Sequence, residues 1–421
     1  MNCCMPSQYV DFPDPGGPMT NCAKGMMADL VLKKVKRNDA ADKGASSSAG
    51  HGTTFRRTAP NHRSDTRPFV SHRDLTSSAT MSSQFELAQN PTDAISSVNF
   101  SPYTPTRLLV SSWDKNVYLY DTHSEPGGQL LQTFEHPAPV LDVCFGRSDD
   151  EAFSCGLDWE VRRIDLTSGE MTVLSTHDAG VRRVVFSKKH NLLVSGGWDA
   201  TLHLHDLETP GEFAVVRVES KVFSLSVSAT KLVVAMANRA VNIYELDALK
   251  KAAGRGGEAQ VEPWQKRESS MKYMTRAVSC MPNDDGYASS SIEGRVAVEW
   301  FDPSEESQKR KYAFKCHRQA IEGQDVVYPV NALAFHPVYG SFASGGGDGV
   351  VSLWDGVNKR RIRQYQRFPA SIASLAFSEN GKHLAVGVSP GFEDGQEDMA
   401  DGAIKVFIRE ISETEAQGKK K

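Results

Sequence analysis

Basic side chains recur over a short part of the chain, at spacings that would let several of them meet one anion. Arg276 ends the segment "SSMKYMTR", and Arg295 ends "SSIEGR". Further on, "KRKYAFKCHR" supplies Lys315 and Arg318. Guanidinium groups bind carboxylates and phosphates through paired hydrogen bonds, and a hydrogen bond to a charged group is worth roughly 1.5–3 kcal/mol. Two arginines brought together are therefore expected to favour a phosphorylated peptide over an unmodified one.

Two tryptophans accompany these cations. Trp113 and Trp198 each stand directly before an Asp in a strand–turn–strand pattern, "SSWDKN" and "GGWDAT". A large ring at the end of a strand gains little from packing within the sheet, so both rings are expected to project near a rim. Exposed Trp beside Arg is a composition typical of binding hot spots.

Catalytic and metal-binding patterns do not occur in the sequence. It has no G-x-S-x-G elbow, H-E-x-x-H pair, G-K-[ST] phosphate loop or dinucleotide fingerprint. Its seven Cys form no C-x-x-C pair, which argues against a zinc site or a disulfide framework. Cys316 has basic neighbours but no identifiable partner base. We therefore expect a protein that is not an enzyme and that uses no cofactor and no metal.

Charge is distributed unevenly along the chain. The formal net charge is −4. Residues 1–83 contain 11 Lys and Arg against 7 Asp and Glu, and the remainder is acidic, with 37 against 45. An acidic body makes general nucleic-acid binding unexpected, so any anion-binding role must come from a local patch. No apolar stretch is long enough to cross a bilayer.

The N-terminal segment 1–83 is rich in Pro, Ser, Thr, Gly, Asn and His and lacks periodic apolar positions. Such a composition cannot bury enough surface to offset backbone ordering, so we expect a disordered extension. Its "KKVKR" is either a nuclear-import patch or a solvated charge run. "MSSQFELAQNP", which begins at Met81, is typical of a natural chain start, which leaves open whether residues 1–80 belong to the mature protein.

From residue 94 onward one pattern returns: an apolar alternating strand, a second strand ending in small residues, a turn with Asp, and a third strand. The copies cover 94–121, 138–165, 179–206, 221–245, 275–302, 328–355 and 370–410. Early steps of about 40 to 45 residues match the period of WD-repeat propeller blades. We predict an all-β, seven-bladed WD40 β-propeller over residues 84–411, followed by a charged tail, 412–421.

Details of the repeat refine this prediction. Trp354-Asp355 is the WD dipeptide itself, and the His of the usual His–Asp pairing is expected among His136, His177 and His317. "QFELAQ" (84–89) is expected to supply the missing outer strand of blade seven, since closing the ring removes exposed sheet edges. Residues 250–265 are expected to be a mobile insertion between blades four and five. The acidic loop 393–402 is expected within blade seven.

The motifs "AISSVNFSP", "LLVSSWDKNVYLYD", "RESSMKYMTR", "SSIEGRVAVE", "KRKYAFKCHR" and "SIASLAFS" go beyond a generic repeat match. Over about residues 84–411 the chain resembles the third member of the "budding uninhibited by benzimidazole" group, a family of WD-repeat proteins of the mitotic spindle-assembly checkpoint. That family is kin to the messenger-RNA export propeller of the nuclear pore. The extension 1–83, the insertion 250–265 and the acidic loop depart from the family core.

The resemblance implies a non-enzymatic scaffold with two classes of partner. One is a short acidic motif of checkpoint kinases and pseudokinase-like proteins; the other is a phosphothreonine repeat of a kinetochore scaffold. Carried over by motif, Arg276 binds the acidic motif with Trp113 and Trp198 on the same face. Arg295 and Arg318, with Lys315, form the phosphothreonine clamp. The implied location is the nucleus, the kinetochore in mitosis, and also the cytoplasm.

Two alternatives stay open at this stage. The chain could belong to the export branch, which binds a nucleoporin motif and RNA, because both branches share the basic loops. A ubiquitin-ligase substrate receptor is possible for any propeller. Binding of RNA, nucleoporin-motif peptides, kinase-motif peptides or ligase adaptors to the purified protein separates these readings.

Overall fold

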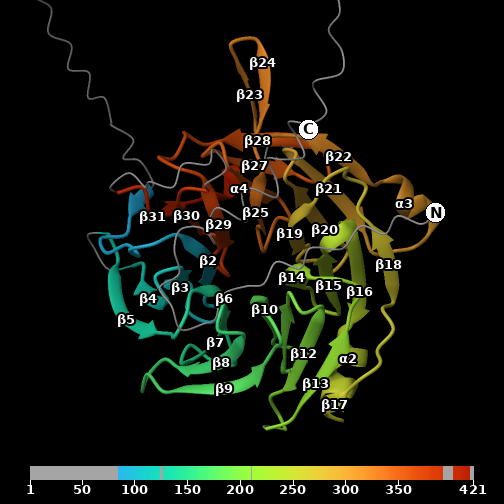
Figure 1. Ribbon diagram of the computed structural model, residues 1–421. Coiled ribbons are helices and arrows are strands. Elements are labelled where there is room, and N and C mark those ends of the chain that lie inside the picture. Colours follow the sequence, from blue (N-terminus) through green and yellow to red (C-terminus); the bar gives the residue numbers. More distant parts are fainter. Residues whose placement is uncertain (1–83, 124–126, 210, 392–401, 418–421) are drawn as a thin grey trace, which may run out of the picture.

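A ring of seven antiparallel sheets encloses a central axis (Figure 1), as seen in a computed structural model that describes residues 84–123, 127–209, 211–391 and 402–417. The predicted seven-bladed β-propeller is therefore confirmed. The innermost strands of successive blades contact one another in sequence, and the last contacts the first, which closes the circle. The expectations for 1–83 and for nearly all of the acidic loop 393–402 lie outside the described residues.

Each blade consists of strands that run outward from the axis in chain order. Blade one contains β2 (Ile95–Phe100), β3 (Arg107–Ser112), β4 (Asn116–Asp121) and β5 (Gln129–Glu135); blade two contains β6 (Val140–Phe145), β7 (Glu151–Gly156), β8 (Glu160–Asp165) and β9 (Met171–Thr176). Blade three contains β10 (Val181–Ser187), β11 (Leu192–Gly197), β12 (Thr201–Asp206), β13 (Phe213–Arg217) and, as a parallel edge strand, β17 (Gly257–Glu258). Blade four contains β14 (Val222–Val227), β15 (Lys231–Met236), β16 (Ala240–Glu245) and β18 (Gln265–Glu268).

Blades five and six follow the same order, whereas the outermost strand of blade seven is the first strand of the described chain. Blade five contains β19 (Thr275–Cys280), β20 (Gly286–Ser291), β21 (Arg295–Trp300) and β22 (Tyr312–Lys315); blade six contains β25 (Val330–Phe335), β26 (Phe342–Gly346), β27 (Val351–Asp355) and β28 (Arg360–Gln364). Blade seven contains β29 (Ile372–Phe377), β30 (His383–Val388), β31 (Lys405–Glu410) and β1 (Gln84–Glu86). As predicted from "QFELAQ", β1 is the outer strand of blade seven, where Phe85 pairs with Ile408.

Small residues at the C-terminal ends of the second strands allow the blades to approach closely. A Cβ added at Gly196 would lie 2.8 Å from Val222 Cγ1 of blade four, and one at Gly345 would lie 2.4 Å from Ile372 Cγ2 of blade seven. The same strands begin with apolar, buried residues, as in Leu192 and Phe342. Glycine at these positions therefore fixes the spacing of the blades around the axis.

Two rims can be distinguished. The upper rim carries the turns between second and third strands and the connections between blades; the lower rim carries the other turns. Backbone bonds join the two kinds of upper segment within a blade, from Trp113 N to Ala94 O and from Trp198 N to Gly180 O, each 2.9 Å. In these blades the turn between the second and third strands is thus held to the segment that leads into the blade.

The insertion 250–265 differs from expectation. It lies between the third and fourth strands of blade four, because β18 completes that blade. Its first part is the end of α2 (Leu246–Ala253), whose Leu249 and Ala253 are buried in the core shared with blade three. Its middle part pairs with β13 as β17. The expectation of a mobile segment between blades four and five is therefore wrong: apolar anchors hold this stretch against its neighbour.

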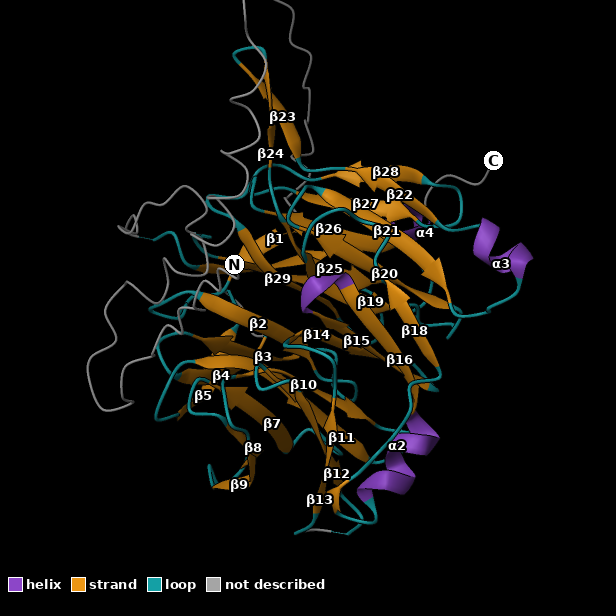
Figure 2. Cartoon of the chain, turned by 45° about the vertical axis from the view of Figure 1, so that its right-hand side comes forward, coloured by secondary structure: helices purple, strands orange, loops and turns teal. Residues whose placement is uncertain are grey.

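Further elements decorate the ring. A hairpin of β23 (Arg318–Ile321) and β24 (Gln324–Val327), not predicted from the sequence, stands out from the ring between blades five and six (Figures 1 and 2). The short helix α3 (Glu305–Lys309) lies between β21 and β22, and α4 (Glu413–Gln417) follows β31. Ala416 of α4 is buried, and its carbonyl accepts a bond from Ser341 Oγ at 2.8 Å. No helix among the described residues is long and apolar enough to cross a membrane.

Candidate functional site

Three of the predicted basic residues meet where blade five adjoins blade six on the upper rim. Arg295 is the first residue of β21, directly after the Glu293-Gly294 turn, and it pairs across strands with Lys315, the last residue of β22. Arg318, the first residue of β23, donates from Nη2 to the carbonyl oxygen of Glu293 at 2.9 Å. Both guanidinium groups therefore adjoin the same turn. We call Arg295, Lys315 and Arg318 the basic clamp.

The position of Arg318 is set by the residue before it. His317 is buried with φ +49°, and its Nδ1 lies 2.8 Å from Asp348 Oδ1 while its Nε2 lies 2.8 Å from Ser344 Oγ. Trp354 Nε1 donates to the same Ser344 oxygen at 2.8 Å. The WD dipeptide and the His–Asp pair of blade six thus anchor the base of the β23–β24 hairpin, and with it Arg318.

The clamp contains carboxylates of its own. Arg295 Nε lies 3.6 Å from Glu293 Oε2, and Arg318 Nη1 donates to Asp325 Oδ2 at 3.3 Å. The guanidinium groups are not enclosed by these partners: the side chains of Arg295 and Arg318 are 34% and 20% exposed, and that of Asp325 is 63% exposed. Three cations against two carboxylates leave a net positive site that is open to solvent, which suits a doubly charged phosphate.

Cys316, between Lys315 and His317, is not poised for chemistry. Its side chain is buried, and burial, reinforced by the charge of Asp348, raises the pKa of the thiol to about 12 despite the nearby Arg318. A thiol protonated at neutral pH is a poor nucleophile. The basic neighbours that drew attention to Cys316 in the sequence therefore belong to the clamp and do not activate the sulfur.

Tryptophans line the upper rim over three successive blades. Trp113 and Trp198 lie in the second-to-third-strand turns of blades one and three, as predicted, and both are partly exposed. Blade two places Trp159 at the corresponding turn, with φ +70° and 45% of its surface exposed. Trp159 was missed because it follows the turn Asp ("GLDWEV") whereas the other two precede it. Lys115 and Ala200 have a similar positive φ directly after the turn Asp of blades one and three, so the left-handed conformation belongs to this turn position in all three blades.

Arg276 is separate from the clamp and closer to the axis. It is the second residue of β19, the innermost strand of blade five, and its Nε donates to Asn331 Oδ1 of β25 at 3.0 Å. The predicted residues thus lie on one rim at three places: the clamp at the boundary of blades five and six, Arg276 on the innermost strand of blade five, and the tryptophans in the turns of blades one and three.

The predicted His–Asp pairing holds for two of three candidates. His317 pairs with Asp348 as described, and His177 Nδ1 lies 3.0 Å from Asp199 Oδ2. His136 instead contacts Ser154 Oγ at 2.8 Å and the carbonyl of Phe134 at 3.0 Å. Its turn residue, Asp158, is already engaged by Arg162, so the pairing is absent in blade two.

His177, Asp199 and His203 lie close enough together to suggest a cation site. Both nitrogens of His177 are occupied, however, since Nε2 lies 2.9 Å from Ser195 Oγ and Nδ1 faces Asp199. His203 stacks on His177 with ring centroids 3.5 Å apart, and its Nδ1 lies 3.0 Å from Ser175 Oγ. The three groups therefore form a structural hydrogen-bonded stack rather than an open set of ligands.

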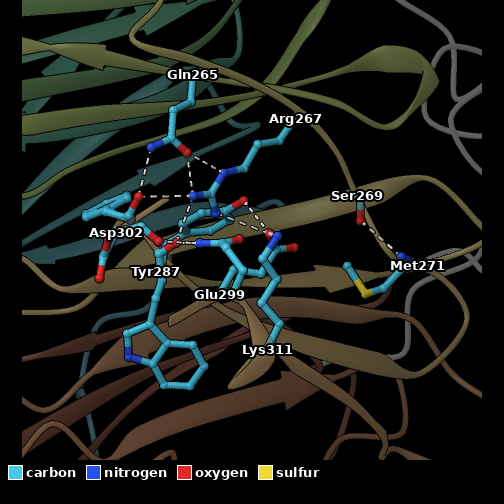
Figure 3. Close-up of polar contacts among 11 residues, drawn as sticks. Gln265, Arg267, Ser269, Met271, Tyr287, Glu299, Asp302 and Lys311 are labelled. Carbon is cyan, nitrogen blue, oxygen red and sulfur yellow. Dashed lines mark hydrogen bonds and ion pairs between the residues drawn. The ribbon is translucent and has the colours of Figure 1, made fainter. Parts of the chain in front are cut away.

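A second polar cluster, toward the lower rim, joins blades four and five (Figure 3). Arg267 of β18 lies 3.4 Å from Glu299 Oε2 of β21 and donates to the carbonyl of Trp300 at 2.7 Å. Tyr287 donates its hydroxyl to Glu299 at 3.2 Å, and Lys311 lies 3.8 Å from the same carboxylate. Because Glu299 is buried, the Arg267 side chain is only 9% exposed and the two groups pair with each other across the blades, we assign this cluster to blade–blade cohesion.

Comparisons with known proteins agree with this architecture. The family described as WD domain, G-beta repeat matches residues 82–121, 169–206 and 311–355. The chain is 45% identical to mitotic checkpoint protein BUB3.1 of Arabidopsis thaliana over 80% of this chain and 95% of that protein. It is 41% identical to mitotic checkpoint protein bub3 of Dictyostelium discoideum over 78% of this chain and 95% of that protein.

A more distant relationship links the chain to export factors. It is 30% identical to mRNA export factor GLE2 of Chaetomium thermophilum, over 77% of this chain and 90% of that protein. The similarity to the checkpoint proteins spans nearly their full length, at higher identity. With the seven-bladed ring and its WD repeats, these comparisons show that the chain belongs to the bub3 family of WD-repeat mitotic checkpoint proteins, with the mRNA export factors as kin.

Proposed function

We propose that this protein is a non-enzymatic scaffold of the spindle-assembly checkpoint that joins two peptides on its upper rim. One is a phosphothreonine repeat of a kinetochore scaffold, bound by Arg295, Arg318 and Lys315. The other is a short acidic motif of checkpoint kinases and pseudokinase-like proteins, bound by Arg276 with Trp113, Trp159 and Trp198. The protein would then work in the nucleus, and at the kinetochore in mitosis.

The observation that carries this proposal is the meeting of Arg295 and Arg318 at the Glu293-Gly294 turn. One guanidinium adjoins the side chain of Glu293 and the other binds its carbonyl oxygen at 2.9 Å. A phosphate carries about −1.5 to −2 charges and three acceptor oxygens, which two forks and an ammonium can share. The phosphate of a phosphothreonine bound over this turn would neutralise the net positive charge of the clamp.

The test is phosphopeptide binding by the variant Arg295→Ala/Arg318→Ala. We expect loss of at least a hundredfold in affinity for a phosphothreonine peptide of the kinetochore scaffold, with the melting temperature unchanged within about 2 °C. Lys309→Ala/Arg361→Ala, which removes the same charge from the lower rim, serves as the control and should bind as the wild type does. Undiminished affinity in the clamp variant would refute the assignment.

The export relatives support a second candidate, binding of a nucleoporin motif and RNA. Their shared ancestry with the checkpoint branch is shown by the 30% identity to GLE2. Titration with single-stranded RNA, a nucleoporin-motif peptide and a kinase-motif peptide separates the two. Tight RNA binding that Arg295→Ala/Arg318→Ala abolishes would favour the export role over the checkpoint role.

A further inference from the structure

The two carboxylates at the basic clamp are held in different ways. The Asp325 side chain is 63% exposed and contacts Arg318 Nη1 at 3.3 Å. The Glu293 side chain is 15% exposed, and both of its carboxylate oxygens are engaged. Its Oε1 accepts from the backbone N–H of Lys272 at 3.1 Å, and its Oε2 lies 3.6 Å from Arg295 Nε. One carboxylate thus lies at the surface, and the other is part of the turn that both arginines adjoin.

The turn that carries Glu293 is held from two sides. On one side, the N–H of Ile292 donates to the Met274 carbonyl at 3.2 Å. On the other side, the N–H of Cys316 donates to the Gly294 carbonyl at 2.9 Å. Gly294 has φ +62°, and a Cβ added there would lie 2.7 Å from the Cys316 carbonyl oxygen. The Glu293 side chain therefore starts from a backbone that its neighbours fix in place.

The orientation of Arg295 depends on the second oxygen of this carboxylate. The Lys272 N–H and the Arg295 Nε–H are both donors, so the group between them must offer two acceptor oxygens. A carboxylate has two, whereas an amide has one and places a donor at the other position. Because Glu293 faces the Nε of Arg295, the guanidinium is ordered before a ligand arrives. Ordering a long side chain in advance removes a cost that binding would otherwise include.

We propose that Glu293 is a positioning residue of the clamp: its charge repels a phosphate, but its carboxylate orients Arg295 and so strengthens phosphothreonine binding on balance. This rests on the proposed function, since the phosphate is the ligand of the clamp. The two acids then have opposite effects. Removing the charge of Asp325 removes a competitor of the phosphate, whereas removing the charge of Glu293 releases Arg295.

The isosteric variant Glu293→Gln separates orientation from charge. We expect its affinity for the phosphothreonine peptide, measured by fluorescence anisotropy, to be about fivefold weaker than that of the wild type, because Arg295 must then be ordered on binding. Loss of the charge alone would act in the other direction and strengthen binding about threefold. Glu322→Gln makes the same charge change at an exposed position in the β23–β24 hairpin, and its affinity should stay within about twofold of the wild type.

A double-mutant cycle identifies the group through which Glu293 acts. In the Arg295→Ala background there is no guanidinium for Glu293 to orient, so Glu293→Gln should then strengthen phosphopeptide binding about twofold. A substitution that only loosened the fold would weaken binding in both backgrounds. Unchanged or stronger binding by Glu293→Gln alone, or the same loss in the Arg295→Ala background, would overturn the inference.

The wild-type protein supplies an independent measurement if Glu293→Gln does not fold. The side-chain Nε–Hε signal of Arg295 in ¹⁵N-labelled protein, assigned by its loss in Arg295→Ala, should lie away from the position of solvent-exposed arginines before any peptide is added. A signal at that position would overturn the inference. Failure of the proposed function gives a different result, because Arg295→Ala/Arg318→Ala would then bind the phosphopeptide as the wild type does.

Discussion

Asp325 occupies part of the clamp in the free protein, which makes Asp325→Asn an informative change. Its carboxylate accepts from Arg318 Nη1 at 3.3 Å, so an incoming phosphate must displace it. The guanidinium stays in place when this contact is lost, because Nη2 is still bound to the Glu293 carbonyl at 2.9 Å. We therefore expect Asp325→Asn to strengthen phosphopeptide binding.

The size of the gain follows from two contributions. An exposed ion pair is worth about 0.2–1 kcal/mol, and Asp325, 63% exposed, belongs to that class. A phosphate of about −2 charges held roughly 7 Å from Asp325 in water, screened at physiological ionic strength, is repelled by a further ~0.5 kcal/mol. Together these give about 0.7–1.5 kcal/mol, or a threefold to tenfold lower Kd.

Fluorescence anisotropy with a labelled phosphothreonine peptide and its unmodified counterpart measures this gain. The unmodified peptide should change less than twofold, and the gain should shrink at 0.5 M salt, where the Debye length is shorter. Asp150→Asn is a matched control, since Asp150 is 65% exposed and pairs with Arg107 at 3.7 Å on the lower rim. Unchanged or weaker phosphopeptide binding by Asp325→Asn, or an equal gain in Asp150→Asn, would refute the competition between Asp325 and phosphate.

Three further predictions follow from buried or exposed groups. Burial, reinforced by His177, lowers the pKa of His203 to about 3 and that of His205 to about 4. The unfolded chain alone therefore takes up these protons below pH ~6.5, and the unfolding free energy should fall toward pH 4 by up to ~2.7 kcal/mol per pH unit. Urea melts should show a shallower fall in His203→Gln/His205→Gln, and an identical fall would contradict the assignment. Arg267→Ala leaves the Glu299 carboxylate buried without its main partner and should cost about 3 kcal/mol, whereas a loss below 1 kcal/mol in thermal unfolding would count against the role given to Figure 3. Trp159→Ala should weaken kinase-motif binding about tenfold in calorimetry with little change in stability, since the ring is 45% exposed; wild-type affinity would remove it from the site.

The repeat made most of the fold predictable, because each copy carries its own alternating strands and turn. The last repeat lacked an outer strand, and "QFELAQ" stood ahead of the first repeat. Closing the ring therefore assigned this segment to blade seven, where β1 lies. The sequence was less informative where the period is interrupted. Nothing in residues 250–265 distinguishes a linker from a stretch held by the burial of Ala252 and Ala253, because that outcome depends on the blade beside it.

The site residues that lie in a recognisable sequence motif were predictable, whereas their arrangement in space was less so. Arg295 and Arg318 are marked by their motifs, but their meeting at Glu293-Gly294 depends on the β23–β24 hairpin, which no repeat contains. Trp159 was missed because it follows the turn Asp, whereas Trp113 and Trp198 precede theirs.

The pairing of β1 with β31, which closes the ring, has a consequence for synthesis of the chain. Gln84 contacts Arg409, 325 residues later. At about 5–20 residues per second of translation, the first strand waits roughly 15–65 s after leaving the ribosome before its partner β31 exists. During that interval the ring is open, and the blades already synthesised form an arc whose two end blades each lack a neighbour. We therefore expect chaperones to cover the exposed faces of these end blades until blade seven is complete and the ring closes.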